Sequence, residues 1–147
     1  MDRDWYELGR QDGSSGAYND AFSQRTAKCS LNEIIQVKAA YESGYRHGLS
    51  LYCTLENGFE LGRNGVEYLP VCPPALASGF EGGYLRGQRF SKLQTEKQGL
   101  DLELSQVLRN LGQPQISPQD VNRLQGQREL LQKQLAEKSA DIEKLKK

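Results

Sequence analysis

The stretch WYELGRQDG at residues 5–13 places two glycines four positions apart, after two aromatic residues, a glutamate and a leucine. The same order of aromatic residue, glutamate and Gly-x-x-x-Gly returns at residues 41–48 and 80–87. A shorter form, whose second glycine comes one position early, occupies residues 59–65. Glycine in a helix interior costs about 1 kcal/mol relative to alanine. Glycines repeated at a helical spacing therefore indicate that a neighbour occupies the space of a side chain.

We interpret this repeat as a mark of helices whose backbones approach closely. A helix face without side chains forms a smooth groove into which a neighbouring helix or an aromatic ring can sink. Three alternatives stay open: Gly-x-x-x-Gly also pairs membrane helices, glycines also mark turns between short strands, and the repeat can be purely structural even where it is helical. Charged residues in each turn weigh against the membrane alternative. The candidate helix-packing positions are Gly9, Gly13, Gly44, Gly48, Gly83 and Gly87.

The two parts of the chain differ in chemistry. All twelve aromatic residues and all three cysteines lie in the first ninety positions, whereas the rest is rich in Leu, Gln, Lys and Glu. Leucines recur at helical spacings on both sides of residues 112–118, a Gly- and Pro-containing segment that stops one helix and starts another. We predict a glycine- and aromatic-rich helical module at residues 4–90 and, as an extension of it, an antiparallel helical hairpin at residues 91–147. Because Arg128 and Lys138 interrupt the apolar heptad positions, a short hairpin is favoured over a long coiled coil.

The predicted fold class is all-α, with one segment of different character. Between Cys53 and Cys72, the Asn-Gly pairs at 57–58 and 64–65 are typical of tight turns. We therefore expect a loop or small hairpin bounded by the two cysteines. The expected order is a helix over about residues 5–28, a helix over about 32–52, a loop to 74, a long helix to 111 and a last helix from 118.

The totals disfavour several classes of function. Nineteen basic and nineteen acidic side chains leave no net charge, so we expect no nucleic-acid partner. No run of about 18 apolar residues is present, so no segment is expected to span a bilayer. The polar start MDRD at residues 1–4 does not resemble a secretory signal, and we expect a processed or trimmed N-terminus.

The residues that could carry chemistry form no recognised constellation. His47 is the only histidine, so a nucleophile has little choice of base. The three cysteines and His47 would supply four zinc ligands but lack the short spacing of a zinc site. Each glutamate of the repeat lies near an arginine, which favours ion pairs over paired catalytic carboxylates. We predict no catalytic residue, no metal site and no cofactor.

The aromatic residues beside the glycine faces support a second hypothesis. A groove between the helices could bind a small molecule or a metal. Asp12, between Arg10 and Gly13, would lie beside this groove, and its favoured role is to brace the fold by bonding a neighbouring backbone group or an arginine side chain. The residues expected to line such a groove are Trp5, Asp12, Tyr41, Tyr45, Tyr52 and Phe80.

Short motifs, taken in order, resemble a known family over roughly residues 4–90. The chain is similar to the bacterial domain of unknown function 2799. Members of that family are small envelope proteins, often lipoproteins, and no agreed activity comes with the name. The resemblance implies the periplasm or cell envelope, including an outer-membrane lipoprotein whose lipid anchor is absent from this chain. The motifs are Asp4-Trp5, GRQDG at 9–13, Cys29, Tyr41-x-x-Gly44, Gly48-Leu49, Tyr52-Cys53, Asn57-Gly58, Gly62-x-x-Gly65, Tyr68 and Val71-Cys72-Pro73.

The oxidising compartment implied by this resemblance would allow a disulfide between Cys53 and Cys72. If the first two helices are antiparallel, Cys29 lies at their shared turn and Cys53 at the opposite end, beside the loop that ends at Cys72. The bond would contribute roughly 3 kcal/mol. Another pairing stays open, as do three free thiols in a reducing compartment.

These features predict a non-catalytic structural or interaction protein of the envelope. The hairpin is expected to contact a partner protein or a second copy of the chain, because it is amphipathic and contains no aromatic residue. The alternative function is the binding of a small molecule or a metal in the aromatic-lined groove.

Overall fold

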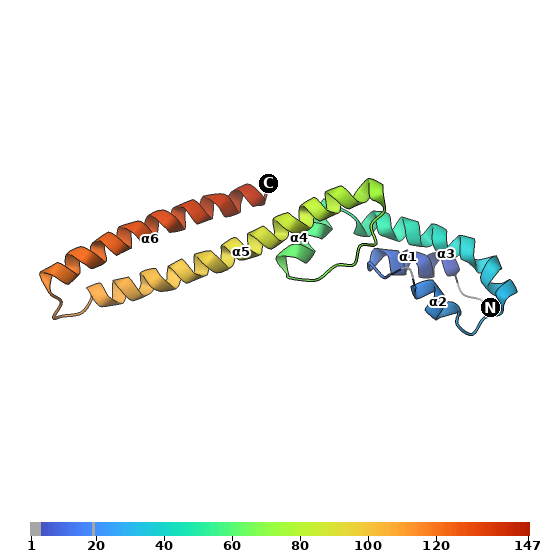
Figure 1. The fold of residues 1–147 in the computed structure, drawn as a ribbon, viewed down its shortest axis with the longest axis horizontal. Helices are drawn as coiled ribbons and strands as arrows, with labels where there is room; N and C mark the ends of the chain where they lie inside the picture. Colours follow the sequence, from blue (N-terminus) through green and yellow to red (C-terminus); the bar gives the residue numbers. More distant parts are fainter. Residues whose placement is uncertain (1–3, 19) are drawn as a thin grey trace. The chain divides into compact units, whose positions relative to one another are not determined.

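The computed structural model describes residues 4–18 and 20–147. Over these residues the chain forms helices and no strand, which confirms the all-α prediction. Residues 1–3, on which the expectation about the N-terminus largely depends, lie outside the described part. The helices are α1 (Trp5–Ser14), α2 (Ala21–Thr26), α3 (Leu31–Tyr52), α4 (Leu55–Arg63), α5 (Pro74–Leu111) and α6 (Pro118–Leu145) (Figure 1).

The chain divides into two compact units. Residues 1–88 form unit 1 and residues 89–147 form unit 2. The division falls close to the boundary expected at residue 90. Helix α5 contributes its first residues to unit 1 and the remainder to unit 2.

Side-chain caps fix where several helices begin. Ser30 and Glu33 form a capping box at the start of α3. At the start of α4, the Thr54 hydroxyl accepts a hydrogen bond from the backbone N–H of Asn57. Ser117 caps α6, as its place before a proline predicts. Each cap satisfies a backbone group that the helix leaves unpaired, so these boundaries are encoded locally.

In unit 1, α1 and α3 lie side by side and run in the same direction (Figure 1). Gly9 of α1 lies against the carbonyl group of Tyr41. In return, Gly44 of α3 lies against the carbonyl group of Tyr6. A Cβ atom added at either glycine would come within 3.0 Å of the facing carbonyl, closer than real Cβ atoms approach. The two backbones therefore touch, in the manner that brings Cα–H groups onto carbonyl oxygens.

Helix α4 and the first part of α5 repeat this construction. Gly58 lies against the carbonyl of Phe80, and Gly83 lies against the carbonyl of Leu55. In both pairs, each glycine faces the carbonyl three residues before the matching glycine of the partner helix. Each parallel pair therefore has an approximate internal twofold symmetry. The contact positions are Gly9, Gly13, Gly44 and Gly48 in the first pair and Gly58, Gly62, Gly83 and Gly87 in the second.

Parallel neighbours need a return segment that carries the chain back to the starting end. Residues 15–30, which include α2, return the chain between α1 and α3, and residues 64–73 return it between α4 and α5. Both segments contain a glycine with positive φ, Gly16 at 70° and Gly65 at 67°, which L side chains rarely adopt. The single helix expected over residues 5–28 is therefore wrong, because the chain turns back after α1.

The segment expected as a loop between the cysteines contains α4. Asn57-Gly58 has the composition of a turn, yet it lies inside this helix, where Gly58 packs against α5. Gly65 does lie in a turn, but no strand flanks it among the described residues. The tertiary contact, rather than composition, distinguishes the glycine that packs from the glycine that turns.

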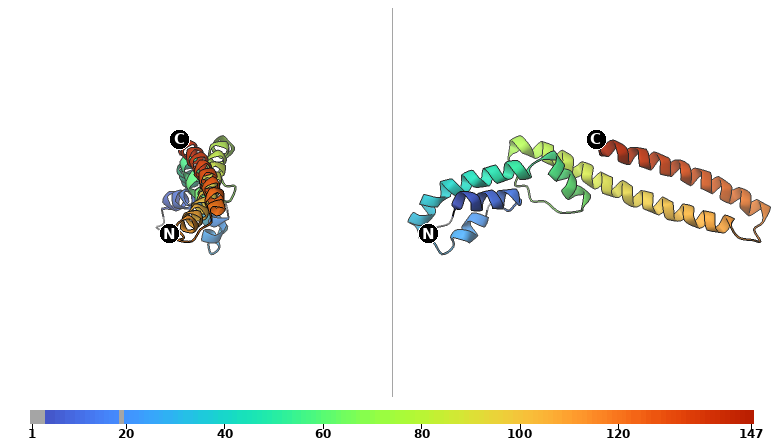
Figure 2. Two further views of the ribbon diagram at one scale, coloured as in Figure 1. Left: turned by 90° about the vertical axis from the view of Figure 1, so that its left-hand side faces the viewer. Right: turned by 180° about the vertical axis from the view of Figure 1, so that it is seen from behind.

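In unit 2, α6 runs back along the second part of α5 to form a helical hairpin (Figure 2). Val107 of α5 and Leu124 and Leu131 of α6 are its buried core. Lys138, which interrupts the apolar pattern, pairs with Glu96 of α5. The packing around this core is completed by Leu100, Leu104, Leu111 and Ile116.

Candidate functional site

Asp12 connects three helices of unit 1. Its carboxylate accepts two hydrogen bonds from the Arg25 guanidinium of α2, at 2.7 and 2.6 Å. It accepts a third from the Tyr41 hydroxyl of α3, at 2.6 Å. Asp12 is only 7% exposed, and bidentate arginine–carboxylate contacts are among the stronger hydrogen bonds in proteins. This Asp12 cluster therefore fixes α2 against the α1–α3 pair.

The same contacts favour the ionised form of Asp12. The hydrogen bonds from Arg25 lower the pKa of Asp12 from its ordinary value of 3.8; burial opposes this, and the Tyr41 hydrogen bond lowers the pKa further. Burial and the bond to Asp12 both raise the pKa of Tyr41. All three polar groups are engaged with one another, as the bracing interpretation of Asp12 expects.

Replacing Asp12 with asparagine is expected to lower the free energy of unfolding by about 2 kcal/mol, because a neutral amide replaces the charged carboxylate that accepts the hydrogen bonds from Arg25 and Tyr41. Since folding lowers the pKa of Asp12, its contribution is present above pH 3.8 and is lost as the pH falls below that value. Urea unfolding followed by Trp5 fluorescence, at neutral and at acidic pH, measures both effects.

The wild-type chain should lose more stability in acid than the Asp12→Asn chain. Glu7→Gln is the matched control, because Glu7 forms a half-exposed ion pair with Arg10 in the same helix, and its effect should be smaller. Equal acid sensitivity of the wild-type and Asp12→Asn chains would contradict the role given to this cluster.

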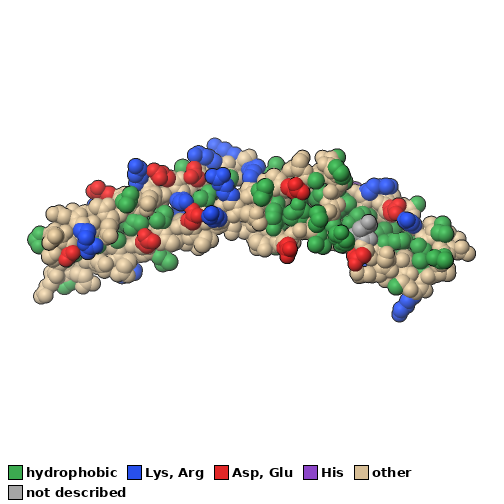
Figure 3. Space-filling view, in the orientation of Figure 1, with side chains coloured by type: hydrophobic (Ala, Val, Ile, Leu, Met, Phe, Trp, Pro, Cys, Tyr) green, Lys and Arg blue, Asp and Glu red, His purple; other side chains and the backbone are tan. Residues whose placement is uncertain are grey.

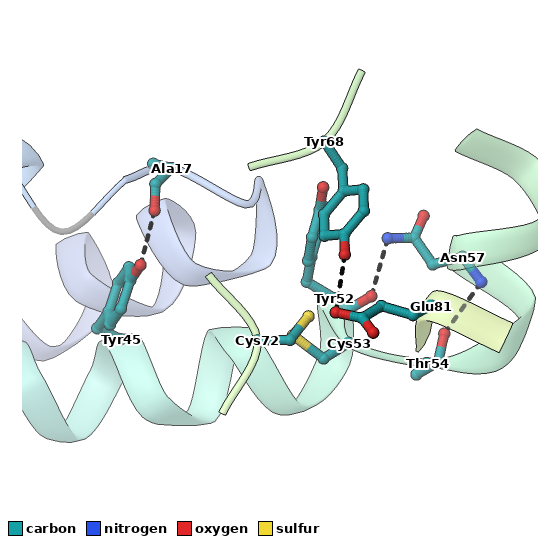
Figure 4. Close-up of a disulfide and its surroundings, with 9 residues drawn as sticks. All are labelled: Ala17, Tyr45, Tyr52, Cys53, Thr54, Asn57, Tyr68, Cys72 and Glu81. Atoms are coloured by element: carbon teal, nitrogen blue, oxygen red, sulfur yellow. Dashed lines mark hydrogen bonds between the residues drawn. A yellow bond between two sulfur atoms is a disulfide. The ribbon is translucent and has the colours of Figure 1, made fainter. Parts of the chain in front are cut away.

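Aromatic rings fill the space beside the α1–α3 contact. Trp5 packs edge-on against Phe22, with ring centroids 6.1 Å apart, and Phe22 lies 4.8 Å from the Tyr41 ring. The Tyr45 hydroxyl donates a hydrogen bond to the carbonyl of Ala17 at 2.7 Å (Figure 4). Trp5 and Tyr41 are buried, so these rings belong to the core of unit 1.

A disulfide joins Cys53 and Cys72, which confirms the predicted pairing. Cys53 directly follows α3, and Cys72 lies near the end of the return segment between α4 and α5 (Figure 4). The antiparallel arrangement assumed for the first two helices was wrong, because α1 and α3 are parallel. Cys29 and Cys53 nevertheless lie at opposite ends of α3, as expected, and Cys29 is a free cysteine.

A second aromatic cluster surrounds this disulfide. Tyr52 stacks on Phe80, with ring centroids 5.3 Å apart, and Tyr68 packs edge-on against Phe80 at 4.8 Å. Phe80 is fully buried. Nearby, apolar side chains gather on the surface over the return segment between α4 and α5 (Figure 3), where Val66 and Leu69 are 45% and 50% exposed.

The residues expected to line one groove are thus divided between two packed clusters. One cluster belongs to the α1–α3 pair and the other to the disulfide region, and in both the rings pack on other rings rather than around an open space. The structure does not bring the six together. Trp5, Asp12, Tyr41 and Tyr45 lie in the first cluster, and Tyr52 and Phe80 lie in the second.

His47 makes a local contact on the surface of the α1–α3 pair. Its Nδ1 atom shares a hydrogen bond of 2.7 Å with the Tyr6 hydroxyl. The four-ligand zinc alternative is overturned, because Cys53 and Cys72 are bonded to each other. Within the described ranges, no group of three or more His, Cys, Asp or Glu side chains is placed to hold a metal ion.

The hairpin of unit 2 carries a groove along one face. Two hollows on this face have volumes of about 410 and 500 Å³, and they adjoin at Glu103 and Gln134, which line both. Val107, Leu124 and Leu131 form an apolar floor in the first hollow. We call this feature the hairpin groove.

The sequence matches the family described as "Protein of unknown function (DUF2799)" over residues 4–89. The chain belongs to the DUF2799 family. The region that matches DUF2799 contains both glycine-paired helix pairs and the disulfide. The hairpin lies almost wholly outside it. No curated protein and no solved structure gives a significant match to the chain.

No described helix is both long enough and apolar enough to cross a bilayer. The longest, α5, carries charged side chains in its hairpin part and glycines in its first part. The membrane alternative for the glycine repeat therefore has no candidate helix in the described part of the DUF2799 chain.

Sequence reasoning missed three residues that the structure brings into contact. Gly58 and Gly62 are the glycines of α4 that contact the backbone of α5. Their spacing of four is visible in the sequence, but the repeat was matched to Gly62 and Gly65 instead. Arg25, the partner of Asp12, carries no local signal, because the two lie 13 residues apart and meet only when α2 folds back.

Proposed function

We propose that the chain is a non-catalytic interaction module of the bacterial cell envelope, in which unit 1 is a rigid scaffold and the hairpin contacts a partner. The observation that carries the proposal is the hairpin groove, where Leu130 lies 57% exposed beside the buried side chains of Val107, Leu124 and Leu131. Apolar surface open to solvent is typical of interaction sites.

Two further features support the proposal. The Cys53–Cys72 disulfide is characteristic of an oxidising compartment such as the periplasm. In unit 1, both buried polar or charged residues among those described are hydrogen-bonded: Asp12 accepts from Arg25 and Tyr41, and the Thr26 hydroxyl donates to a backbone carbonyl. Such contacts are those of a scaffold that holds its shape.

The hairpin also exposes leucines outside the floor of its groove. Leu102, Leu108 and Leu130 are 72%, 48% and 57% exposed. Of these, Leu130 lines the groove, whereas Leu102 and Leu108 do not. These positions allow contact on the hairpin to be tested without presuming that the groove itself is used.

A photo-activated crosslinking residue at Leu102, Leu108 or Leu130 tests the proposal in the cell that makes the protein. At least one hairpin position should give a discrete adduct, whose mass shows whether the partner is another protein or a second copy. The same residue at Leu31, which is 78% exposed in unit 1, is the matched control. Adducts from Leu31 alone, or none from the hairpin, would overturn the proposed function.

A further inference from the structure

We propose that the hairpin groove binds one amphipathic helix of a partner protein, with an apolar stripe that ends in lysine or arginine residues. This inference rests on the proposed function and specifies the chemistry of the partner.

The groove has the length of a short helix. On α5 its lining runs from Glu96 to Asn110, which at 1.5 Å per residue corresponds to about 21 Å. On α6 the lining runs from Arg123 to Asp141 in the opposite direction. A single helix of about 14–16 residues fits this length.

The floor and one wall suit an apolar stripe. Val107, Leu124 and Leu131 lie along the floor and are themselves buried, so the apolar surface open to a partner comes chiefly from Leu130 at the edge, which is 57% exposed. Gly99 opens the wall of the second hollow, because a Cβ atom there would meet nothing within 4 Å. A helix needs this combination of apolar floor and open wall to place its side chains at i, i+3 and i+4 spacings.

The rim is acidic toward one end. Lys138 pairs with Glu96 and Lys144 pairs with Asp141, whereas among the described residues Glu103 and Glu137 form no ion pair. At the other end, near the hairpin turn, Arg123 is paired with Asp120. The unpaired charge of the groove is therefore negative. A helix with basic residues at the matching end would complement it. The acidic residues of the second hollow are Glu96, Glu103, Glu137 and Asp141.

A second copy of the chain complements this groove poorly. Glu103 lines both hollows and so lies near the middle of the groove. Two grooves placed face to face would bring the two Glu103 carboxylates together in either the parallel or the antiparallel arrangement. Like charges brought together at an interface disfavour the complex, so the charge pattern selects a cationic partner helix.

Peptide binding to the full chain tests this inference. The probe is a synthetic helix of about 16 residues with leucines on one face and lysines in its last two turns, labelled for fluorescence anisotropy. The comparison peptide carries glutamate in place of each lysine. The lysine peptide should bind at least tenfold more tightly at low salt, and the difference should shrink as salt screens the charges.

Two glycine replacements on the hairpin supply the matched controls. Gly99→Leu fills the open wall of the groove, whereas Gly126→Leu adds the same side chain at a position that is equally open but does not line the groove. Gly99→Leu should weaken binding of the lysine peptide at least tenfold, and Gly126→Leu should leave it unchanged. Circular dichroism should show both variants as helical as the wild type, because each replaces a helical glycine.

Three outcomes would overturn the inference. They are equal binding of the two peptides, equal effects of the two leucine variants, and a dimer of the free chain that Gly99→Leu abolishes. The last would identify a second copy as the occupant and leave the proposed function intact. Failure of the proposed function is seen separately, as the absence of crosslinks from every hairpin position.

Discussion

Replacing Gly83 with alanine is expected to lower the free energy of unfolding of unit 1 by about 3 kcal/mol or more. Overpacking a filled core costs roughly 1–3 kcal/mol when side chains can adjust. Here the added methyl group meets the backbone carbonyl of Leu55, which cannot rotate away. The helices α4 and α5 would have to separate, and the neighbouring contacts at Gly58 and Gly87 would weaken with them.

The adjacent glycine of the same helix is the matched control. A Cβ atom at Gly82 would meet nothing within 4 Å, so Gly82→Ala should raise stability by roughly 0.5–1 kcal/mol through helix propensity alone. Urea unfolding followed by circular dichroism measures both variants. Changes of the same sign for Gly82→Ala and Gly83→Ala would contradict backbone contact at this crossing.

Removing the disulfide by the double replacement Cys53→Ala/Cys72→Ala is expected to lower the free energy of unfolding by about 3 kcal/mol. The bond spans a sequence separation of 19 residues that includes α4 and the second return segment. Without it, the unfolded chain gains freedom and the return segment loses its anchor beside Tyr52 and Phe80. Urea unfolding of the oxidised wild type and the double variant measures the difference.

Cys29→Ala is the control for this experiment, because Cys29 is free. Its replacement should leave the effect of reducing agents on the wild type unchanged. Thiol titration of the unreduced protein should give one reactive group per chain. Three reactive groups, or a double variant as stable as the wild type, would show that the disulfide does not form or does not hold the return segment.

The sequence predicted the parts of the fold that local signals encode. The Gly and Pro residues around 112–118 mark the turn of the hairpin, and Ser117 caps α6 as predicted. The glycines of α1 and α3 were assigned to helix packing from their spacing alone. These features depend on periodicity and capping, which are properties of neighbouring residues.

The pairing of helices could not be predicted in the same way. Spacing shows that Gly44 and Gly48 accept a close neighbour, but not that the neighbour is α1 or that it runs parallel. The parallel direction depends on the segment between α1 and α3 that carries the chain back. Gly16 lies in this segment with a positive φ, and nothing in the sequence distinguishes it from a packing glycine. Conversely, Gly58 was assigned to a turn because it follows Asn57, and no local signal shows that it packs against α5.

The candidate sites show a similar limit. The bracing role of Asp12 could be inferred from its surroundings, whereas its partner Arg25 is brought near only by the return through α2. Tyr52 and Phe80 have the aromatic character of a ligand groove, yet they stack on each other beside the disulfide. The hairpin groove depends on which faces of α5 and α6 meet, and on Gly99 leaving one wall open.

Nuclear Overhauser cross-peaks between the Hα protons of Gly13 and Gly48 test the central claim most directly. A Cβ atom at either of these glycines would lie within 3.0 Å of the Cα atom of the other, so the account predicts strong cross-peaks between α1 and α3. Helices held apart by side chains at an ordinary axial distance of about 8–10 Å would give none. Their absence in the folded protein would contradict the glycine-to-backbone construction of unit 1.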